Sequence, residues 1–68
     1  MKDISFKFGT KLKNKRKRLN IAQEKMALLA DIDRSYMGRI ERGEVNITLV
    51  KAYHIAEALG CDIRDLLP

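Results

Sequence analysis

Proline occurs only at the last of the 68 positions of this chain, so no proline interrupts a helix anywhere before it. Apolar residues recur at helical steps of three, four and seven positions, without the alternation that marks a β-strand. The sequence therefore predicts an all-α fold of five short helices. A chain this short lies near the lower limit for folding without a disulfide or a metal, so we expect one domain, residues 1–68, around one shared core.

Two helices are expected in the first half of the chain. The first runs from about residue 5 or 6 to residue 19, and Asn20 then supplies a left-handed cap, a conformation that asparagine tolerates. The second covers residues 22–30. The side chains expected to face inward from these two helices are those of Phe8, Leu12, Leu19, Met26, Ala27 and Ala30.

Three more helices are expected in the second half. Asp33 caps the third helix, its carboxylate accepting from the backbone N–H of Ser35 or Tyr36, and Gly43 ends it in a left-handed conformation. Thr48 caps a fourth helix that ends near residues 59–60, and Asp62 starts a short fifth. The inward residues expected of the fourth helix are Leu49, Ala52, Ile55, Ala56 and Leu59.

The positive charge is concentrated at the N-terminal end. Residues 1–22 hold eight Lys/Arg against one acidic residue, whereas residues 23–68 hold six Lys/Arg against eight acidic residues. The segment KLKNKRKR, residues 11–18, has six cations in eight positions. Such a block suits an anionic partner, either nucleic acid or a lipid surface, and on charge alone a solvated helix explains it equally well.

Composition argues against several classes of function. One cysteine, Cys61, and one histidine, His54, on another helix do not make a structural metal site. No His–carboxylate or Cys–His set shares a face and no phosphate-binding loop occurs, so we reject an enzyme. No apolar run approaches the ~18 residues of a membrane span, and no secretory signal is present. We expect a cytoplasmic protein without cofactor, metal or small-molecule ligand.

The connection between the second and third expected helices is about three residues long, which is the spacing of a helix-turn-helix. Residues 22–60 resemble the phage repressor and Cro family, also called the XRE family. The resemblance rests on Gln23-Glu24, Ala27, Ile40-Glu41, Gly43, Asn46, Thr48-Leu49 and the run IAEALG at 55–60, and with the first helix and DIRDLL it covers nearly the whole chain. It implies a five-helix, lambda-repressor-like domain that regulates transcription by placing the third helix in the DNA major groove.

Within this family, the run DRSYMGRIERGEVNIT is most similar to small controller proteins of restriction–modification systems, and other small XRE regulators carry a similar run. Two positions depart from the family pattern. Ala22 replaces the usual capping residue of the second helix, at a cost of about 1 kcal/mol. Asp31 replaces the usual turn glycine, so a left-handed conformation there is mildly strained.

A helical wheel separates two faces of the third helix, residues 33–42. Tyr36, Met37 and Ile40 fall on the core side. Gly38 falls on the opposite side, where a close approach by a partner would explain a glycine inside a helix. The outer side also carries Ser35, Arg39 and Arg42, with Arg34 at its edge.

Three residues of this helix are candidates for contacts to DNA bases. Arg34 lies in the first turn, which points at base edges, and its guanidinium can donate two hydrogen bonds to a guanine. Arg39, one turn further on, is the next candidate, with phosphate or a surface ion pair as alternatives. Ser35 is the third, although its role could equally be to support the helix cap.

Phosphate contacts are expected around these residues. Arg42 lies at the far end of the third helix, and Tyr36 is mainly a core residue whose hydroxyl reaches a phosphate. The resemblance implies that Gln23 clamps a phosphate at the start of the second helix. Asn46 and Thr48 could form a second clamp, or bond only within the local turn and cap.

Two further sets of residues follow from the resemblance. The resemblance implies that Glu41 pairs with Arg16 in a buried structural bridge. The basic block is expected, from its charge, to attract phosphate diffusely, with Lys11, Lys15 or Lys17 at the edge of the DNA footprint. The fourth and fifth helices are the usual homodimer interface in this family, which implies a two-fold symmetric operator. The residues expected at that interface are Val50, Tyr53, Glu57, Ile63, Leu66 and Leu67.

A second hypothesis remains open, in which the chain is an antitoxin-like or adaptor module whose main partner is a protein. An outward-facing Leu28 and the surplus apolar residues at the C-terminal end favour it. The leading interpretation is a cytoplasmic regulator that binds double-stranded DNA and associates with the nucleoid through it.

Overall fold

The computed structural model describes the backbone of residues 2–68 and the side chains of residues 4–68, and this part of the chain is all-helical. Its elements are α1 (Lys2–Arg18), α2 (Gln23–Ala30), α3 (Arg34–Glu41), α4 (Leu49–Leu59) and the 3-10 turn η1 (Ile63–Asp65). The predicted fold class is confirmed. The expected fifth helix is a single 3-10 turn, so the fold described has four α-helices.

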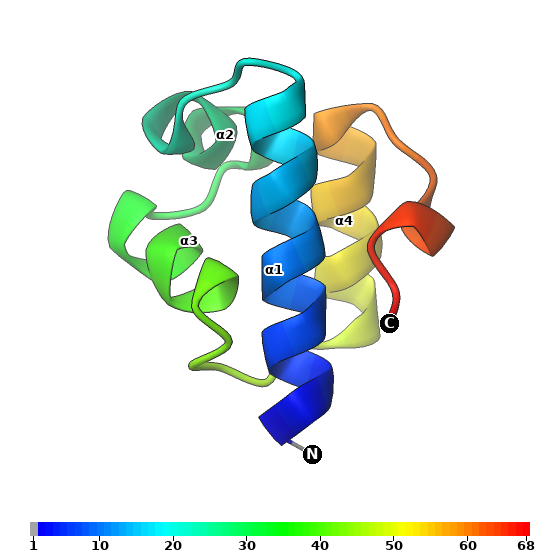
Figure 1. Cartoon of the computed structure of the whole chain (residues 1–68). Coiled ribbons are helices and arrows are strands. Elements are labelled where there is room, and N and C mark those ends of the chain that lie inside the picture. The colour runs from blue at the N-terminus through cyan, green and yellow to red at the C-terminus, as the bar shows by residue number, and fades with distance from the viewer. Residues whose placement is uncertain (1) are drawn as a thin grey trace.

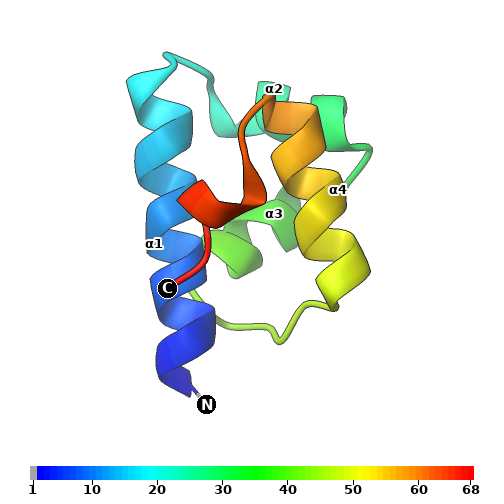
Figure 2. The same ribbon diagram turned by 90° about the vertical axis from the view of Figure 1, so that its right-hand side faces the viewer.

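The long helix α1 stands in front of α4, and α2 and α3 are stacked on one flank of it (Figure 1). After α4 the chain turns back, and η1 lies over the space between α1 and α4 (Figure 2). Helix α3 packs against both α1 and α2. Helices α2 and α3 are therefore supported by α1 and α4, against which they pack.

The core gathers side chains from all four helices and from η1. Its fully buried members include Leu12, Met26, Met37, Ile55 and Leu66. Two expected core residues are wrong, since Leu19 is 45% exposed and Leu49 is 68% exposed. Leu19 follows the last residue of α1 and Leu49 is the first residue of α4, so both exposed leucines lie at helix ends.

The predicted caps account for the helix boundaries around the motif. Asp33 accepts hydrogen bonds from the backbone N–H groups of Ser35 and Tyr36, at 3.0 and 3.3 Å. Asn20 and Asp31 both adopt left-handed conformations, with φ of 58° and 54°. Ala22 is the extended N-cap of α2 and makes no side-chain cap bond. The tight turn from α2 to α3 is therefore specified locally, by residues 31–33.

Two glycines bring α1 close to the end of α3. A Cβ added to Gly9 would lie 2.6 Å from the carbonyl oxygen of Glu41, and one added to Gly43 would lie 2.6 Å from the Cα of Phe6. Backbone atoms occupy these positions, so no larger residue fits without moving a helix. This close packing fixes the orientation of α3 relative to α1.

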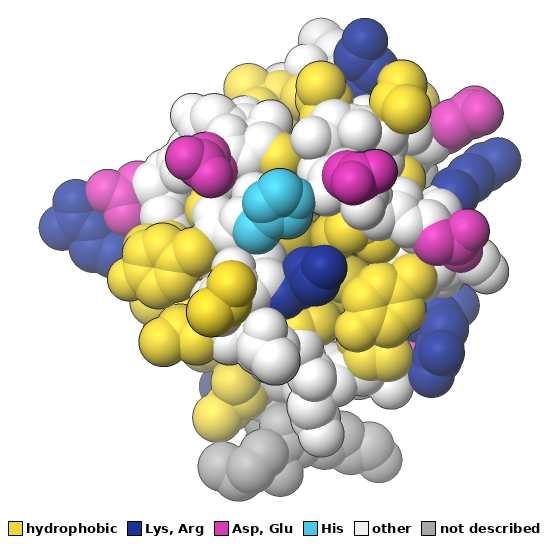
Figure 3. All heavy atoms as spheres, turned by 180° about the vertical axis from the view of Figure 1, so that it is seen from behind, with side chains coloured by type: hydrophobic (Ala, Val, Ile, Leu, Met, Phe, Trp, Pro, Cys, Tyr) yellow, Lys and Arg dark blue, Asp and Glu magenta, His cyan; other side chains and the backbone are white. Residues whose placement is uncertain are grey.

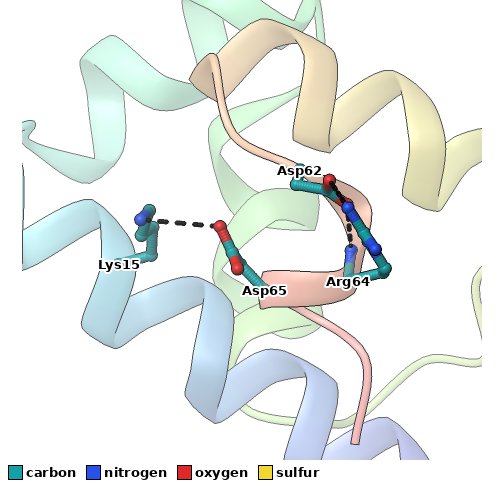
Figure 4. A network of polar contacts seen from close by, with 4 residues as sticks. All are labelled: Lys15, Asp62, Arg64 and Asp65. Carbon is teal, nitrogen blue, oxygen red and sulfur yellow. Dashed lines mark hydrogen bonds and ion pairs between the residues drawn. The ribbon is translucent and has the colours of Figure 1, made fainter.

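The C-terminal turn is fastened to α1 by polar contacts (Figure 4). The Lys15 ammonium lies 3.7 Å from the Asp65 carboxylate. The Lys11 ammonium donates to the carbonyl oxygen of Leu67 at 2.8 Å. Within the turn, Asp62 accepts from the backbone and the guanidinium of Arg64. Two lysines of the basic block therefore face η1.

No helix in the described part of the chain is long and apolar enough to cross a membrane.

Candidate nucleic-acid interface

Helix α3 exposes one polar side and buries the other. Met37 is fully buried and Ile40 is 2% exposed, while Tyr36 is half-buried against the same core. The side chains that remain exposed on this helix and its C-cap are Arg34, Ser35, Arg39 and Arg42. The structure thus brings the predicted base-contacting residues together on one surface, at the outer side of a helix-turn-helix.

A shallow hollow of about 470 Å³ opens on this surface, between the start of α2 and the outer side of α3. Its lining consists of Gln23, Asp33, Arg34, Ser35, Gly38 and Arg42. Gly38 was expected to allow a close approach by a partner; in the structure the groups that approach it are the protein's own side chains of Gln23 and Arg42, which cover it. The absence of a Cβ lets those two side chains lie close to the helix backbone.

A buried ion pair lies beneath this hollow. Arg16 on α1 donates from Nε to Oε2 of Glu41 at 2.7 Å and from Nη2 to Oε1 at 3.1 Å. The two side chains are 9% and 2% exposed, so water screens the pair weakly. The third guanidinium nitrogen, Nη1, donates to the carbonyl oxygen of Ile21. Arg16 and Glu41 are therefore brought together as the family resemblance implies, joining α1, α3 and the loop before α2.

Gln23 connects this buried ion pair to the surface hollow. Its amide nitrogen donates to Oε1 of Glu41 at 3.1 Å, and its amide oxygen lies over Gly38. An amide nitrogen has two N–H groups, so one remains for a partner outside the protein. Gln23 is thereby held at the start of α2, beside the exposed end of that helix.

Glu44 is a residue of this surface that sequence reasoning missed. Its carboxylate accepts from Nε of Arg42 at 2.7 Å and from Nη2 at 3.3 Å, and it lies 3.9 Å from Nε of Arg39. These hydrogen bonds from Arg42 lower the pKa of the Glu44 carboxyl. Helical ion pairs join residues three or four positions apart, whereas Glu44 comes five residues after Arg39, beyond the end of α3.

Asn46 and Thr48 lie exposed in the segment before α4. The Asn46 side-chain oxygen accepts from the Ser5 hydroxyl at 2.7 Å, which ties this loop to α1. The Thr48 hydroxyl oxygen accepts from the backbone N–H of Lys51 at 3.0 Å and so caps α4. The Asn46 amide N–H groups and the Thr48 hydroxyl proton remain as donors.

The residues expected at a dimer interface divide into three groups. Val50, Tyr53, Glu57 and Ile63 line a common hollow of about 610 Å³, and Val50 is 80% exposed. Leu67 instead lines a separate apolar hollow of about 420 Å³, beside Ile4 and Leu49. The expectation for Leu66 is wrong, because it is fully buried in the core. Figure 3 shows hydrophobic side chains reaching the surface on the side of the molecule where α4 lies.

Comparison with known proteins agrees with this geometry. The sequence profile of the helix-turn-helix family matches residues 12–66. The control protein C.MunI of Mycoplasma is 40% identical over 67 residues, covering 97% of this chain and 90% of that protein. The control protein C.BamHI of Bacillus amyloliquefaciens is 39% identical, covering 96% of this chain and 82% of that protein.

A solved structure extends the agreement to three dimensions. The restriction–modification controller protein C.AhdI of Aeromonas hydrophila superposes with a TM-score of 0.86 at 40% identity, covering 91% of this chain and 94% of that one. The family match begins within α1, at residue 12, and spans α2, the turn, α3, α4 and η1. The chain therefore belongs to the helix-turn-helix family, in its XRE-type branch.

Proposed function

We propose that this protein is a sequence-specific, double-stranded DNA-binding transcription regulator of the restriction–modification controller kind. The observation that carries the proposal is the outer side of α3, where Arg34, Ser35, Arg39 and Arg42 are exposed opposite an inner side that packs on the core. The names of its relatives, control and controller proteins, support the regulatory role. The protein would act without cofactor or metal, as a binding protein and not as an enzyme, in the cytoplasm and on the nucleoid.

In this proposal α3 enters the major groove, and some of the residues at the interface contact bases while others contact phosphates. Arg34, Ser35 and Arg39 contact bases, with Arg34 in the first turn giving the strongest discrimination. Arg42, Gln23, Tyr36, Asn46 and Thr48 hold phosphates on either side. The free N–H of the Gln23 amide beside the start of α2 supports its phosphate role, since a helix N-terminus favours an anion.

The proposed regulator binds a two-fold symmetric operator as a homodimer. One helix-turn-helix makes few contacts, and two copies on half-sites about one helical turn apart multiply them. The exposed apolar residues Val50 and Tyr53, with Ile63 and Glu57 around the same hollow, support this face as the interface. Leu67 lines a separate hollow and lies outside this face, and Leu66 contributes by holding η1 in place.

Selection of bound DNA from a random library tests the proposal directly. The expected result is enrichment of a two-fold symmetric motif with a guanine in each half-site, which Arg34→Ala then ceases to select. Failure to enrich any motif would contradict sequence-specific binding. An asymmetric single half-site would contradict the dimer while leaving DNA binding intact.

Sedimentation velocity at high micromolar concentration tests the dimer separately. The wild type should sediment as a dimer and Val50→Glu as a monomer. Leu28→Glu is the matched control, because Leu28 is 75% exposed on α2 and the same charge is introduced away from the proposed interface. A dimer lost in the Leu28 variant and kept in the Val50 variant would move the interface to α2.

A further inference from the structure

Glu44 is the only acidic residue, among the side chains described, that forms ion pairs with arginines of the outer side of α3. One carboxylate lies between two of the three arginines proposed to touch DNA. It accepts from Arg42 at 2.7 and 3.3 Å, and lies 3.9 Å from Arg39. The side chains of all three residues are about half-exposed, so the contacts form on the surface itself.

The pairing orients the Arg42 side chain. Glu44 takes the edge of the guanidinium formed by Nε and Nη2, which leaves both N–H groups of Nη1 and one of Nη2 free. Nη1 points over Gly38, where a Cβ would meet it at 3.1 Å, and so into the hollow that Gln23 and Arg34 also line. Arg42 therefore presents one defined donor edge to a partner in that hollow.

The same pairing weakens attraction to phosphates in other positions. A carboxylate competes with phosphate for an arginine fork, because both anions bind it in the same bidentate manner. It also repels a phosphate that approaches Arg39 or Arg42 directly. Non-specific DNA binding consists almost wholly of such phosphate contacts, whereas cognate binding adds base contacts that fix the register.

We propose that Glu44 is a specificity-determining residue of this surface, which rests on the proposed DNA-binding function. It holds Arg42 toward the one phosphate that a cognate register places in the hollow, and it withholds Arg42 and Arg39 from phosphates in other registers. Glu44 thereby lowers affinity for non-cognate DNA more than affinity for the operator.

The test compares Glu44→Gln with the wild type on operator DNA and on scrambled DNA of the same length, over a range of salt concentrations. Affinity for scrambled DNA should rise about three- to tenfold at low salt, with a log–log salt slope steeper by about one. Operator affinity should change less than twofold, so the specificity ratio falls. Asp31→Asn is the matched control, because it removes the same charge at an exposed position where asparagine keeps the left-handed conformation.

Two outcomes would overturn the inference. Equal gains on both DNAs would make Glu44 a general source of repulsion, and unchanged affinities on both would remove it from the interface. In either case the wild type still selects an operator, so the proposed function stands. If the wild type itself fails to discriminate between the two DNAs, it is the proposed function that fails.

Discussion

Arg16 on α1 and Glu41 on α3 form a buried, two-pronged ion pair, with 2.7 Å between Nε and Oε2, at the place where the first helix supports the third. Replacing one partner leaves the other charge buried and unpaired. We expect Arg16→Met to lower the free energy of unfolding by about 3–5 kcal/mol, measured by urea denaturation.

The double variant Arg16→Met with Glu41→Leu tests whether the lost stability comes from the unpaired charge or from the changed side-chain packing. Because no charge is then left buried, most of the lost stability should return. A single variant that loses less than about 1 kcal/mol would show that water reaches the pair, contrary to its burial.

We expect Arg34 to contribute to discrimination between DNA sequences and not only to overall affinity for DNA. Arg34→Ala is expected to weaken operator binding by about 1–3 kcal/mol and to spare binding to unrelated DNA, as measured by fluorescence anisotropy. Arg64→Ala provides the control, since it removes the same charge from an exposed residue of η1. Equal losses on both DNAs would instead assign Arg34 to a phosphate.

Replacement of Gly38 should change the stability of the fold and its affinity for the operator in opposite directions. Alanine is the better helix former, and its Cβ would meet only the ends of flexible side chains, Arg42 Nη1 at 3.1 Å and Gln23 Oε1 at 3.5 Å. Gly38→Ala is therefore expected to raise the free energy of unfolding by about 0.5–1 kcal/mol. Operator affinity should fall, because the methyl group pushes the Arg42 guanidinium out of its position in the hollow. A less stable variant would show that Arg42 cannot move aside.

Asp62 should contribute a pH-dependent part of the stability. Hydrogen bonds from the side chain and backbone of Arg64 lower its pKa from 3.8 to about 2. A lowered pKa means that the carboxylate stabilises the fold above its unfolded pKa and loses this effect as pH falls through the folded value. The difference in stability between the wild type and Asp62→Asn should therefore be constant near neutral pH, decline as pH falls below 3.8 and vanish once pH is below about 2. Asparagine also caps helices, so a difference that persists below about pH 2 would reflect geometry instead of charge.

The parts of the fold that depend on local chemistry could be predicted from the sequence. Asp33 and Thr48 cap their helices, and Asn20, Asp31 and Gly43 take positive φ, because each needs only its own neighbours in the chain. The tight turn between α2 and α3 follows from the same residues. The all-helical fold class could be predicted for a similar reason, since periodicity is a local property.

Burial at the helix ends could not be predicted in this way. Periodicity predicted Leu19 and Leu49 as core residues, but it does not show whether another element covers a helix end, and both leucines are exposed there. Leu66 was expected at the dimer surface, because periodicity does not reveal that η1 folds back across α1 and α4 and buries this residue. Glu44 was missed because its partners lie across a helix end, where the three- and four-residue spacing of helical ion pairs no longer applies.

The burial of Leu66 also bears on the synthesis of the protein. Leu66 is fully buried in the core, and its neighbour Leu67 accepts from Lys11, a residue made 56 positions earlier. While the ribosome is still adding residue 60, all four helices exist in sequence but the side of α1 that meets η1 is uncovered. The nascent chain can therefore complete its core, and become a competent regulator, only after translation has passed residue 66.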